Sequence, residues 1–549
     1  MKSAFLVVLS AICSSVLAGG NPNRPPEPVE IDVAVAGLGL AGAEIMTLAK
    51  AAGRDPVAFE SRASFGGRTT TIDVGEYTLT KGGSWQQGTG RNHPLTRRLS
   101  ECSINNVGQN WNKWLDYCLD GQECGNSWGD FESSFACAEA LSEQLKAEGV
   151  APVSQDTGMR LCGWLAQNDD EYLVQDSTFR FEWAEPLSVT SLQSSLPWLT
   201  YSVYNDADNY ITDSRGSQEM IGCWLDRYGF GRAASSKLNY NSAIANIDTD
   251  AQILTLVNGS RYHYQVLFNT IPIGVLSWNQ AREDGSLFTP PLSPERQLAL
   301  HGYHTPVYQK IFMQFPTAFW NDFSPNKEFF NIAPVASHSC TLWQNVDLPN
   351  WLPGSRIIYL TCTSPQSDYA ENLSEDQWTE LLMPELRRIF GSDIPSPDLV
   401  VVSRWKNDPN FRGTYSNRIV EGTGDRFDQL FEPFGTNESH ILTGEAYCAN
   451  LNGYMHGALL AAQTSWCEYQ VRTGALPEET PCRAVATDAD GEALPNFCFD
   501  EAVESRKRQN NAPRFARHNR ISRHNGNSQE NFAARAAAKL DTAVGRLSL

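Results

Sequence analysis

The sequence predicts an α/β fold, because a buried strand, a glycine-rich turn and a helix follow one another near its start. Residues 31–36 form an apolar run with the length of a strand. The run GLGLAG at residues 37–42 comes directly after it, and residues 43–52 have the composition of a helix. A second apolar run at residues 57–59 ends at Glu60. This order is typical of the first βαβ unit of a Rossmann-like domain.

Each part of this unit has a physical role in binding a nucleotide. Gly37 permits the tight turn, Gly39 lets the backbone approach a pyrophosphate, and Gly42 lets the helix pack closely on the strand. The helix N-terminus near Ala41 offers free N–H groups and a dipole that favour the pyrophosphate charge. Glu60 is placed to accept hydrogen bonds from the adenosine ribose, and an acid there disfavours a 2′-phosphate. We therefore expect nucleotide binding.

The residues after Glu60 favour a flavin over a nicotinamide. Arg62 is followed by the run GGRT at residues 66–69, which contains Gly67 and Arg68. Adjacent glycines and an arginine at this distance suit a loop that folds back over a diphosphate. The stretch resembles the flavin-dependent amine oxidase family, which implies a glutathione-reductase-like domain that binds FAD.

The resemblance extends to two more cofactor contacts. The run GGSW at residues 82–85, followed by NHPL at 92–95, is similar to the family's contact along the isoalloxazine ring. In the family, the glutamate at the position of Glu445 holds the ribityl chain, and a Gly-Tyr turn like that at Tyr454 opens a helix that faces the flavin. The resemblance implies these cofactor contacts: Gly37, Gly39, Ala41, Gly42, Glu60, Arg62, Gly67, Arg68, Gly82, Gly83, Ser84, Trp85, Ile244, Trp405, Gly444, Glu445 and Tyr454.

Within the family, the chain most resembles the secreted polyamine oxidases of plants and fungi. The matching runs are EWAEP at residues 182–186, VYQKIF at 307–312, RW at 404–405 and GTYSN at 413–417. They occur in the family's order. The resemblance implies oxidation of a polyamine such as spermidine, spermine or an acetylated form. Hydride transfer to flavin N5 gives an imine, which hydrolyses to an aldehyde and a shorter amine, and oxygen is reduced to hydrogen peroxide.

Lys310 is the expected catalytic residue. It lies in an apolar run, where an unpaired lysine is costly. In the family, this lysine holds a water beside flavin N5; the alternative is an edge-strand lysine that reaches solvent. Monoamine oxidases attach flavin through a cysteine at the position of Thr414, so the resemblance implies noncovalent FAD here.

The resemblance also implies a substrate tunnel with an aromatic cage. Tyr415 and Tyr454 would form two walls of the cage, since aromatic faces attract an amine cation. Gln87 departs from the family pattern, because an acid or histidine is common at this position. A neutral amide would hold a polyamine less tightly. The implied substrate contacts are Glu182, Trp183, Tyr308, Tyr415, Tyr454 and Gln87.

The family pattern divides the chain into alternating segments. We expect the FAD-binding domain to consist of residues 29–99, 238–278 and 440–470. The two inserts, residues 100–237 and 279–439, should form a discontinuous mixed α+β substrate-binding domain.

Two local patterns within these segments predict secondary structure. Residues 244–247 and 253–257 alternate like the strands of a hairpin, with Asn258-Gly259 as the turn. Residues 377–390 predict a helix with one apolar face. That face is expected to contain Leu381, Leu382, Leu386 and Ile389.

The N-terminus and the cysteines predict export from the cell. Residues 1–18 have the charged start, apolar core and small final residues of a signal peptide. One of the thirteen cysteines, Cys13, lies there, and an even number in the secreted remainder suggests disulfides, with the pairing open. Asn258, Asn372 and Asn437 begin glycosylation sequons. We expect an extracellular glycoprotein.

The C-terminal extension, residues 471–549, has a different composition. Residues 505–523 contain seven basic side chains and no acid, so we expect disorder there. The tail could contact an acidic cell surface or wall polymer, although a solvated tail is the simpler interpretation. Residues 506–508, RKR, could be a processing site, and residues 532–547 predict a short helix.

The formal charge of −20 argues against nucleic acid as a partner. This charge would steer a small cationic amine toward the protein, or it serves only to keep the chain in solution. We expect no transmembrane segment after the signal peptide. Molecular oxygen is the second expected substrate, and no metal site is expected. Two alternatives stay open: an L-amino-acid oxidase, for which Arg412 is a candidate carboxylate clamp, and a secreted flavin-binding protein without turnover.

Overall fold

The computed structural model describes residues 27–194, 204, 207–280, 287–334, 340–420, 424–499 and 528–547. The expected signal peptide and the expected disordered basic tail lie outside these residues. Within the described part, no helix has both the length and the apolar character needed to cross a membrane.

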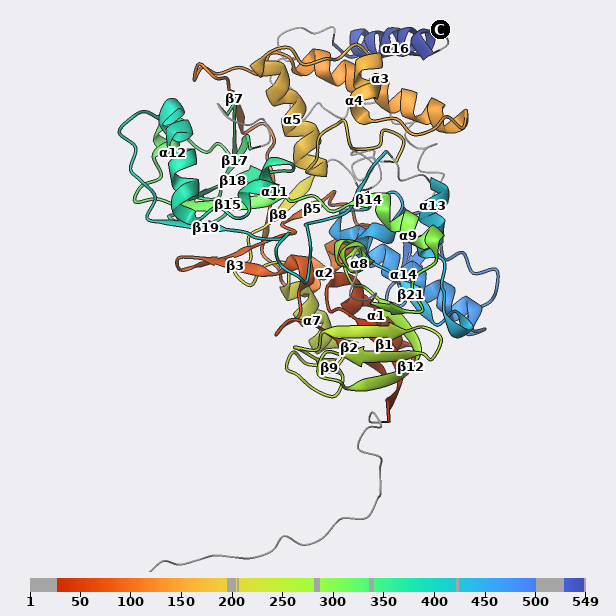
Figure 1. Ribbon diagram of the computed structural model, residues 1–549. Helices are drawn as coiled ribbons and strands as arrows, with labels where there is room; N and C mark the ends of the chain where they lie inside the picture. Colours follow the sequence, from red (N-terminus) through yellow and green to blue (C-terminus); the bar gives the residue numbers. More distant parts are fainter. Residues whose placement is uncertain are drawn as a thin grey trace, which may run out of the picture.

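One part of the fold is built on a mixed sheet that collects strands from distant segments. At its centre, β1 (Val29–Ala36) runs parallel to β2 (Pro56–Phe59) on one side and to β12 (Arg261–Asn269) on the other. β9 (Leu238–Asn239) and β21 (His440–Leu442) extend it in parallel. Figure 1 shows this sheet at the bottom of the view. The prediction of an α/β fold is therefore confirmed.

Helix α1 (Leu40–Ala51) begins three residues earlier than the sequence predicts. The reason is that Leu40, Ala41 and Gly42 of the glycine-rich run already form its first turn. α1 packs against α14 (Met455–Arg472) and α7 (Glu219–Arg227), and buried residues of all three helices share one core.

The hairpin turn expected at Asn258-Gly259 was assigned to the wrong pair of strands. β10 (Ile244–Asp248) and β11 (Ile253–Leu256) do pair antiparallel, but the chain turns between them at residues 249–252. The Asn258-Gly259 turn instead joins β11 to β12, which pair antiparallel. Both turns contain polar residues, and the sequence alone does not show which pair of strands each connects.

A second sheet forms the core of the other part, with α12 (Glu375–Phe390) against it. Its strands lie in the order β19-β15-β18-β17-β16-β7. Figure 1 places these strands and α12 together at the upper left. Their bounds are β7 (Trp114–Tyr117), β15 (Gln309–Gln314), β16 (Phe329–Ile332), β17 (Leu342–Asn345), β18 (Ile357–Cys362) and β19 (Leu399–Val402).

The expected apolar face of α12 is correct except for one residue. Leu382, Leu386 and Ile389 are buried, whereas Leu381 is 52% exposed. The buried stripe extends from Leu382 toward Met383, and Leu381 points about 100° away from Leu382 on the opposite side, toward solvent. Trp378, four residues before Leu382, takes its place in that stripe.

Three helices cover the top of the molecule, and the C-terminal helix lies beside one of them. They are α3 (Trp128–Ala147), α4 (Gln155–Leu161) and α5 (Asp169–Trp183). The helix expected at residues 532–547 is present as α16 (Ser528–Leu547), and Figure 1 shows it against α3. Lys539 Nζ donates to Ser134 Oγ of α3 at 2.7 Å, and Ala543 is buried in the shared core.

Short elements complete the described chain. A three-stranded sheet of β5 (Trp85–Gln87), β8 (Asp208–Ile211) and β6 (Asn106–Gly108) lies between the two parts. The other helices are α2 (Pro94–Glu101), α8 (Ile273–Gln280), α9 (Pro294–His301), α10 (Phe319–Phe323), α11 (Gln366–Ala370) and α13 (Gly424–Phe431). The other strands are β3 (Thr71–Val74), β4 (Tyr77–Thr80), β13 (Phe288–Thr289), β14 (Tyr303–His304), β20 (Asn417–Arg418), β22 (Val485–Thr487) and β23 (Ala493–Pro495).

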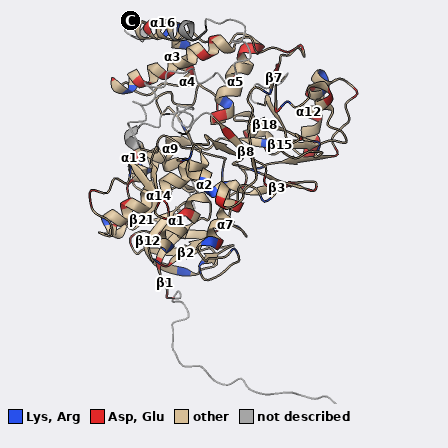
Figure 2. Cartoon of the chain, turned by 180° about the vertical axis from the view of Figure 1, so that it is seen from behind, with Lys and Arg blue, Asp and Glu red and all other residues tan. Residues whose placement is uncertain are grey.

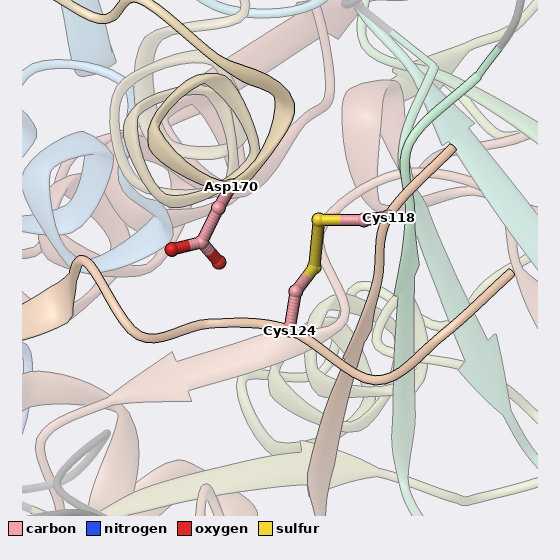
Figure 3. Close-up of side chains that lie close together, drawn as sticks. All are labelled: Cys118, Cys124 and Asp170. Carbon is pink, nitrogen blue, oxygen red and sulfur yellow. A yellow bond between two sulfur atoms is a disulfide. The ribbon is translucent and has the colours of Figure 1, made fainter. Parts of the chain in front are cut away.

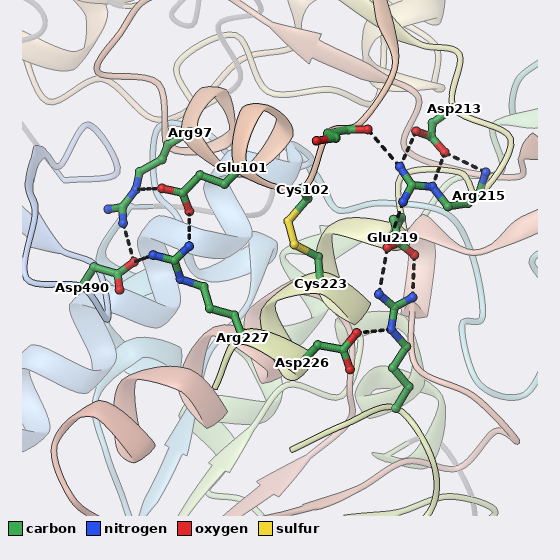
Figure 4. Close-up of a disulfide and its surroundings, with 12 residues drawn as sticks. Arg97, Glu101, Cys102, Asp213, Arg215, Glu219, Cys223, Asp226, Arg227 and Asp490 are labelled. Carbon is green, nitrogen blue, oxygen red and sulfur yellow. Dashed lines mark hydrogen bonds and ion pairs between the residues drawn. A yellow bond between two sulfur atoms is a disulfide. The ribbon is translucent and has the colours of Figure 1, made fainter. Parts of the chain in front are cut away.

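All twelve cysteines after Cys13 are paired in six disulfides. The Cys102–Cys223 bond joins α2 to α7, with ion-pair clusters on both sides of it (Figure 4). In one cluster, Asp490 of the C-terminal extension pairs with Arg97 of α2. The other bonds are Cys118–Cys124, Cys137–Cys162, Cys340–Cys362, Cys448–Cys498 and Cys467–Cys482.

Asp170 lies beside the Cys118–Cys124 disulfide (Figure 3). The spacing of these three residues could suit a metal ion, but their contacts show that they fix a loop. The Asp170 carboxylate accepts hydrogen bonds from the N–H groups of Asn126 at 3.1 Å and Ser127 at 2.9 Å. The two sulfur atoms are bonded to each other, and thiolates are the form of cysteine that binds metals. The cluster therefore holds the loop before α3 against α5.

Charged residues of both signs are interspersed over both parts of the fold (Figure 2).

We predict that Leu386→Ala lowers the free energy of unfolding by about 2–5 kcal/mol, because a fully buried side chain is removed and a cavity remains. Leu381→Ala is the matched control on the same helix, and its effect should stay within about 0.5 kcal/mol. Denaturant unfolding of both variants measures the difference. Equal losses would contradict the assigned face of α12.

Candidate functional site

A cavity of about 620 Å³ runs between the two parts of the fold. This volume is typical of sites that enclose a small molecule or cofactor. Its wall comes from the β1–α1 turn, the loop after β2, the loop after β4, the end of α5 and the start of α14.

The glycine-rich turn forms one end of this cavity. Gly37 has a φ of +93°, and a Cβ there would lie 2.8 Å from Thr270 Oγ1. Gly42 lies behind the turn, where a Cβ would be 2.1 Å from the carbonyl oxygen of Gly37. Gly42 therefore allows α1 to approach the strand and is not part of the cavity wall. Gly39 and Gly67 both line the cavity, and their backbones contact each other, which leaves no room for a side chain between them.

The polar groups at this end fit a cofactor that contains a diphosphate and a ribose. No side chain caps the N-terminus of α1 at Gly39. Glu60 accepts hydrogen bonds from the N–H groups of Leu38 and Arg62, both at 2.9 Å, which fixes its carboxylate in the wall. Arg62 Nη1 is buried without a hydrogen-bond partner among the described residues. An anion at this place would supply that partner.

Glu445 is a carboxylate of the cavity wall with several close hydrogen-bond donors. It accepts from Arg68 Nη1 at 2.7 Å, from Ser416 Oγ at 2.6 Å and from the N–H of Gly453 at 2.7 Å. Gly453 directly precedes the N-cap of α14, Tyr454, whose side chain does not cap the helix. This N-terminus opens onto the cavity, where its dipole favours negative charge.

Lys310 lies behind the wall. Its Nζ donates to Ser84 Oγ at 2.7 Å and to the carbonyl of Gly82 at 2.9 Å, and both of these residues line the cavity. The lysine itself is only 1% exposed, and burial lowers its pKa to about 7. Lys310 is thus bonded to two residues of the cavity wall and can act on a molecule in the cavity through them.

Glu182 holds the tyrosines of the expected cage at the opposite end. The hydroxyl of Tyr454 donates to the Glu182 carboxylate, and the hydroxyl of Tyr415 donates to the Glu182 carbonyl at 2.8 Å. Tyr308 lies beside Tyr415, with ring centroids 6.1 Å apart. Glu182 and Trp183 are the last two residues of α5, and the left-handed Ala184 ends that helix.

The Glu182 carboxyl is poised to change charge near neutral pH. Burial raises its pKa to about 7, and the nearby charge of Asp208 acts in the same direction. The hydrogen bond from Tyr454 opposes the shift. Glu182 thus differs from Glu445, because it accepts one hydroxyl, whereas Glu445 is paired with a cation and also accepts from Ser416 and Gly453.

Asp208 is an acid that the sequence analysis missed. It opens β8 and pairs in register with Gln87 of β5, and both residues line the cavity. Its carboxylate accepts from the Trp111 indole N–H at 2.9 Å and from the N–H of Gly88 at 3.1 Å. The wall next to Gln87 therefore carries an acid, although Gln87 itself is neutral.

The structure brings nearly all of the expected site residues to one cavity. Gly42 and Lys310 are the two that do not line it, and every other expected cofactor or substrate contact does. The wall also contains residues that sequence reasoning missed, namely Lys81, Trp111, Phe181 and Asp208. The pairing of Asp208 with Gln87 spans about 120 residues of the sequence and has no local signal.

Comparison with known proteins is consistent with this site. The model of the family described as flavin containing amine oxidoreductase matches residues 179–465, just over half of the chain. Polyamine oxidase 6 of Oryza sativa subsp. japonica is 26% identical over 476 residues, which cover 80% of this chain and 92% of the relative. Polyamine oxidase 1 of Zea mays is 26% identical over 473 residues, with the same coverage.

Solved structures confirm the fold. Wild-type putrescine oxidase superposes with a TM-score of 0.64 at 16% identity, and the match covers 81% of this chain and 99% of that one.

We predict that Glu182 makes stability depend on pH. The raised pKa means that the folded protein keeps this proton between about pH 4.5 and 7, where the unfolded chain has lost it. The contribution is fully present below pH 4.5 and is lost as the pH rises through 7. Between the two pKa values, each rise of one in pH lowers the free energy of unfolding by at most about 1.4 kcal/mol.

Thermal unfolding from pH 5 to pH 8 measures this effect. Wild type should lose stability relative to Glu182→Gln, which stays neutral throughout. The exposed Glu478→Gln variant is the control and should follow wild type. Parallel curves for wild type and Glu182→Gln would show that the Glu182 carboxyl does not titrate near 7.

Proposed function

Since the chain belongs to the flavin containing amine oxidoreductase family, we propose that this FAD-dependent amine oxidase acts on polyamines outside the cell. Glu60, Arg62, Arg68 and Glu445 would hold FAD, which would supply a hydride acceptor for the substrate carbon next to the nitrogen and a route for two electrons to oxygen, giving hydrogen peroxide. The substrate C–N bond becomes an imine, which water cleaves to an aldehyde and a shorter amine.

The observation that carries the polyamine proposal is a pair of carboxylates in one aromatic cavity. Glu182 and Asp208 both line it, and they are close enough for the charge of one to raise the pKa of the other. A substrate with several ammonium groups complements two acids, whereas a monoamine uses only one. The names of the similar plant proteins support the same substrate class.

The aromatic residues are suited to hold the reacting nitrogen. Tyr415 and Tyr454 are both anchored to Glu182, so their rings are fixed relative to the same residue. Aromatic faces attract an amine cation without forming a bond that would retain the neutral product. Glu182, with its pKa near 7, can hold the proton that the substrate nitrogen must lose before hydride transfer.

The structure gives less support to the alternative of an amino-acid oxidase. Such an enzyme needs a cation beside the reacting carbon to clamp a carboxylate. The guanidinium of Arg412 lies 4.3 Å from the ring centre of Trp278 in α8, whereas the two tyrosines contact Glu182 of α5. The candidate clamp therefore packs against α8, whereas the candidate cage is anchored to α5.

Two features support noncovalent FAD and secretion. Thr414 stands where a cysteine tether would be, and its hydroxyl accepts from the N–H of Tyr308 at 3.1 Å. All twelve cysteines after Cys13 are in disulfides, which leaves no free thiol among them for a tether. Six disulfides are typical of proteins that fold in an oxidising compartment.

An amine panel with peroxide detection tests the proposed function. Spermidine, spermine and their acetylated forms should give hydrogen peroxide and an aldehyde in equal amounts. Turnover of L-amino acids instead would overturn the polyamine proposal, and bleachable flavin without peroxide from any amine would point to a binding protein.

We predict that Asp208→Asn raises KM for spermidine and spermine by about tenfold with little change in kcat. A hydrogen bond between charged groups is worth about 1.5–3 kcal/mol, and binding that is equal in ground and transition states appears in KM alone. A monoamine of the same length is the control, because its single charge lies at the oxidised end. An equal rise for both substrates would indicate distortion of the cavity.

We predict that Lys310→Met keeps FAD bound but slows turnover by about a hundredfold, the scale of a lost proton-transfer group. The variant keeps the packing stem and removes the amine. Stopped-flow measurement of flavin bleaching by amine, and then of recovery with oxygen, shows which half-reaction slows. If Lys310 acts through its contact with Ser84, then Ser84→Ala should slow the same phase. Unchanged rates in both phases would remove Lys310 from the mechanism.

A further inference from the structure

Lys81 is a cation in the cavity wall that the proposed reaction does not use. It follows β4 and directly precedes Gly82, whose carbonyl binds Lys310. Its Nζ donates to the carbonyl of Arg404 at 2.7 Å and lies 4.3 Å from the ring centre of Trp405. Lys81 and Trp405 both line the cavity.

No carboxylate in the described chain lies within ion-pair distance of Lys81 Nζ. Glu371 and Asp408 exert attraction only from farther away. Glu371 already accepts from the N–H groups of Trp405, Lys406 and Asn407, and Asp408 accepts from the N–H of Asn410 at 2.9 Å. Burying a cation without a counterion is costly, and here burial lowers the lysine pKa.

A second cation without a counterion shares an aromatic ring with Lys81. The guanidinium of Arg62 lies 5.3 Å from the centre of the Phe411 ring, and Lys81 Nζ lies 5.8 Å from it. Arg62 Nη1 is buried and lacks a partner among the described residues. Two uncompensated cations in one wall repel each other unless an anion is bound beside them.

We propose that Lys81 is a cofactor-binding residue whose charge stabilises the negative charge of bound FAD. The oxidised cofactor carries its negative charge on the diphosphate, and reduction adds electrons to the ring. Lys81 therefore slows loss of FAD and raises the midpoint potential of the bound flavin. The proposal rests on FAD as cofactor and not on the proposed substrate, so a failed amine panel leaves it intact.

The test is the rate at which the purified holoenzyme loses FAD, followed by flavin fluorescence after dilution. Lys81→Met keeps the stem that packs on Trp405 and removes the charge. FAD should leave about tenfold faster, which corresponds to about 1.4 kcal/mol. Lys81→Arg keeps the charge and should stay within about twofold of wild type. Lys50→Met, an exposed lysine of α1, controls for the change in net charge.

Spectroelectrochemical titration of the same holoenzymes gives a second measurement that activity does not influence. A midpoint potential lower in Lys81→Met than in Lys81→Arg supports the proposal. If the Met and Arg variants lose FAD equally fast and share one potential, Lys81 acts by packing and the proposal is wrong. It is also wrong if all variants match wild type in both measurements.

Discussion

The architecture of the site depends on one buried carboxylate, that of Glu445. Its three close donors come from the loop after β2, from the second insert and from the turn before α14. A buried charge is tolerated only when it is paired and hydrogen-bonded, so Arg68, Ser416 and Gly453 must all be in place for this arrangement to be stable. The carboxylate therefore holds together the segments that form the cofactor end of the cavity.

The cavity separates two kinds of carboxylate by their surroundings. Glu445 is held by a cation and two other donors, and this arrangement suits a structural role. Glu182 is desolvated and accepts one tyrosine hydroxyl, which brings its pKa to about 7. Opposite environments for two carboxylates in one site are a recurring way to obtain one fixed charge and one proton acceptor. The same contrast applies to the cations, since Arg68 is paired whereas Arg62 and Lys81 are not.

The local patterns of the sequence predicted the βαβ unit well, because strand, turn, helix and Glu60 lie within about 30 residues. They also predicted α12 and α16, although Leu381 was placed on the wrong face. Strand pairing was predicted less well, both for neighbouring strands and for distant segments. The Asn258-Gly259 turn was assigned to the wrong strands, and the acid beside Gln87 lies on β8, about 120 residues away. The family resemblance predicted Lys310 as the catalytic residue. Only the packed structure shows that this lysine is bonded to Ser84 and Gly82 of the cavity wall.

The contact between Arg68 and Glu445 joins residues that are 377 positions apart. A ribosome adds about 5–20 residues per second, so Arg68 leaves it roughly 20–75 seconds before its partner. From its own synthesis until that of β21, β12 lacks this neighbour, and the turn at Gly39 lacks the part of the cavity wall that contains Glu445. The nascent chain must therefore protect an open sheet edge until β21 has been made, and FAD can lock the fold only after Glu445 has left the ribosome.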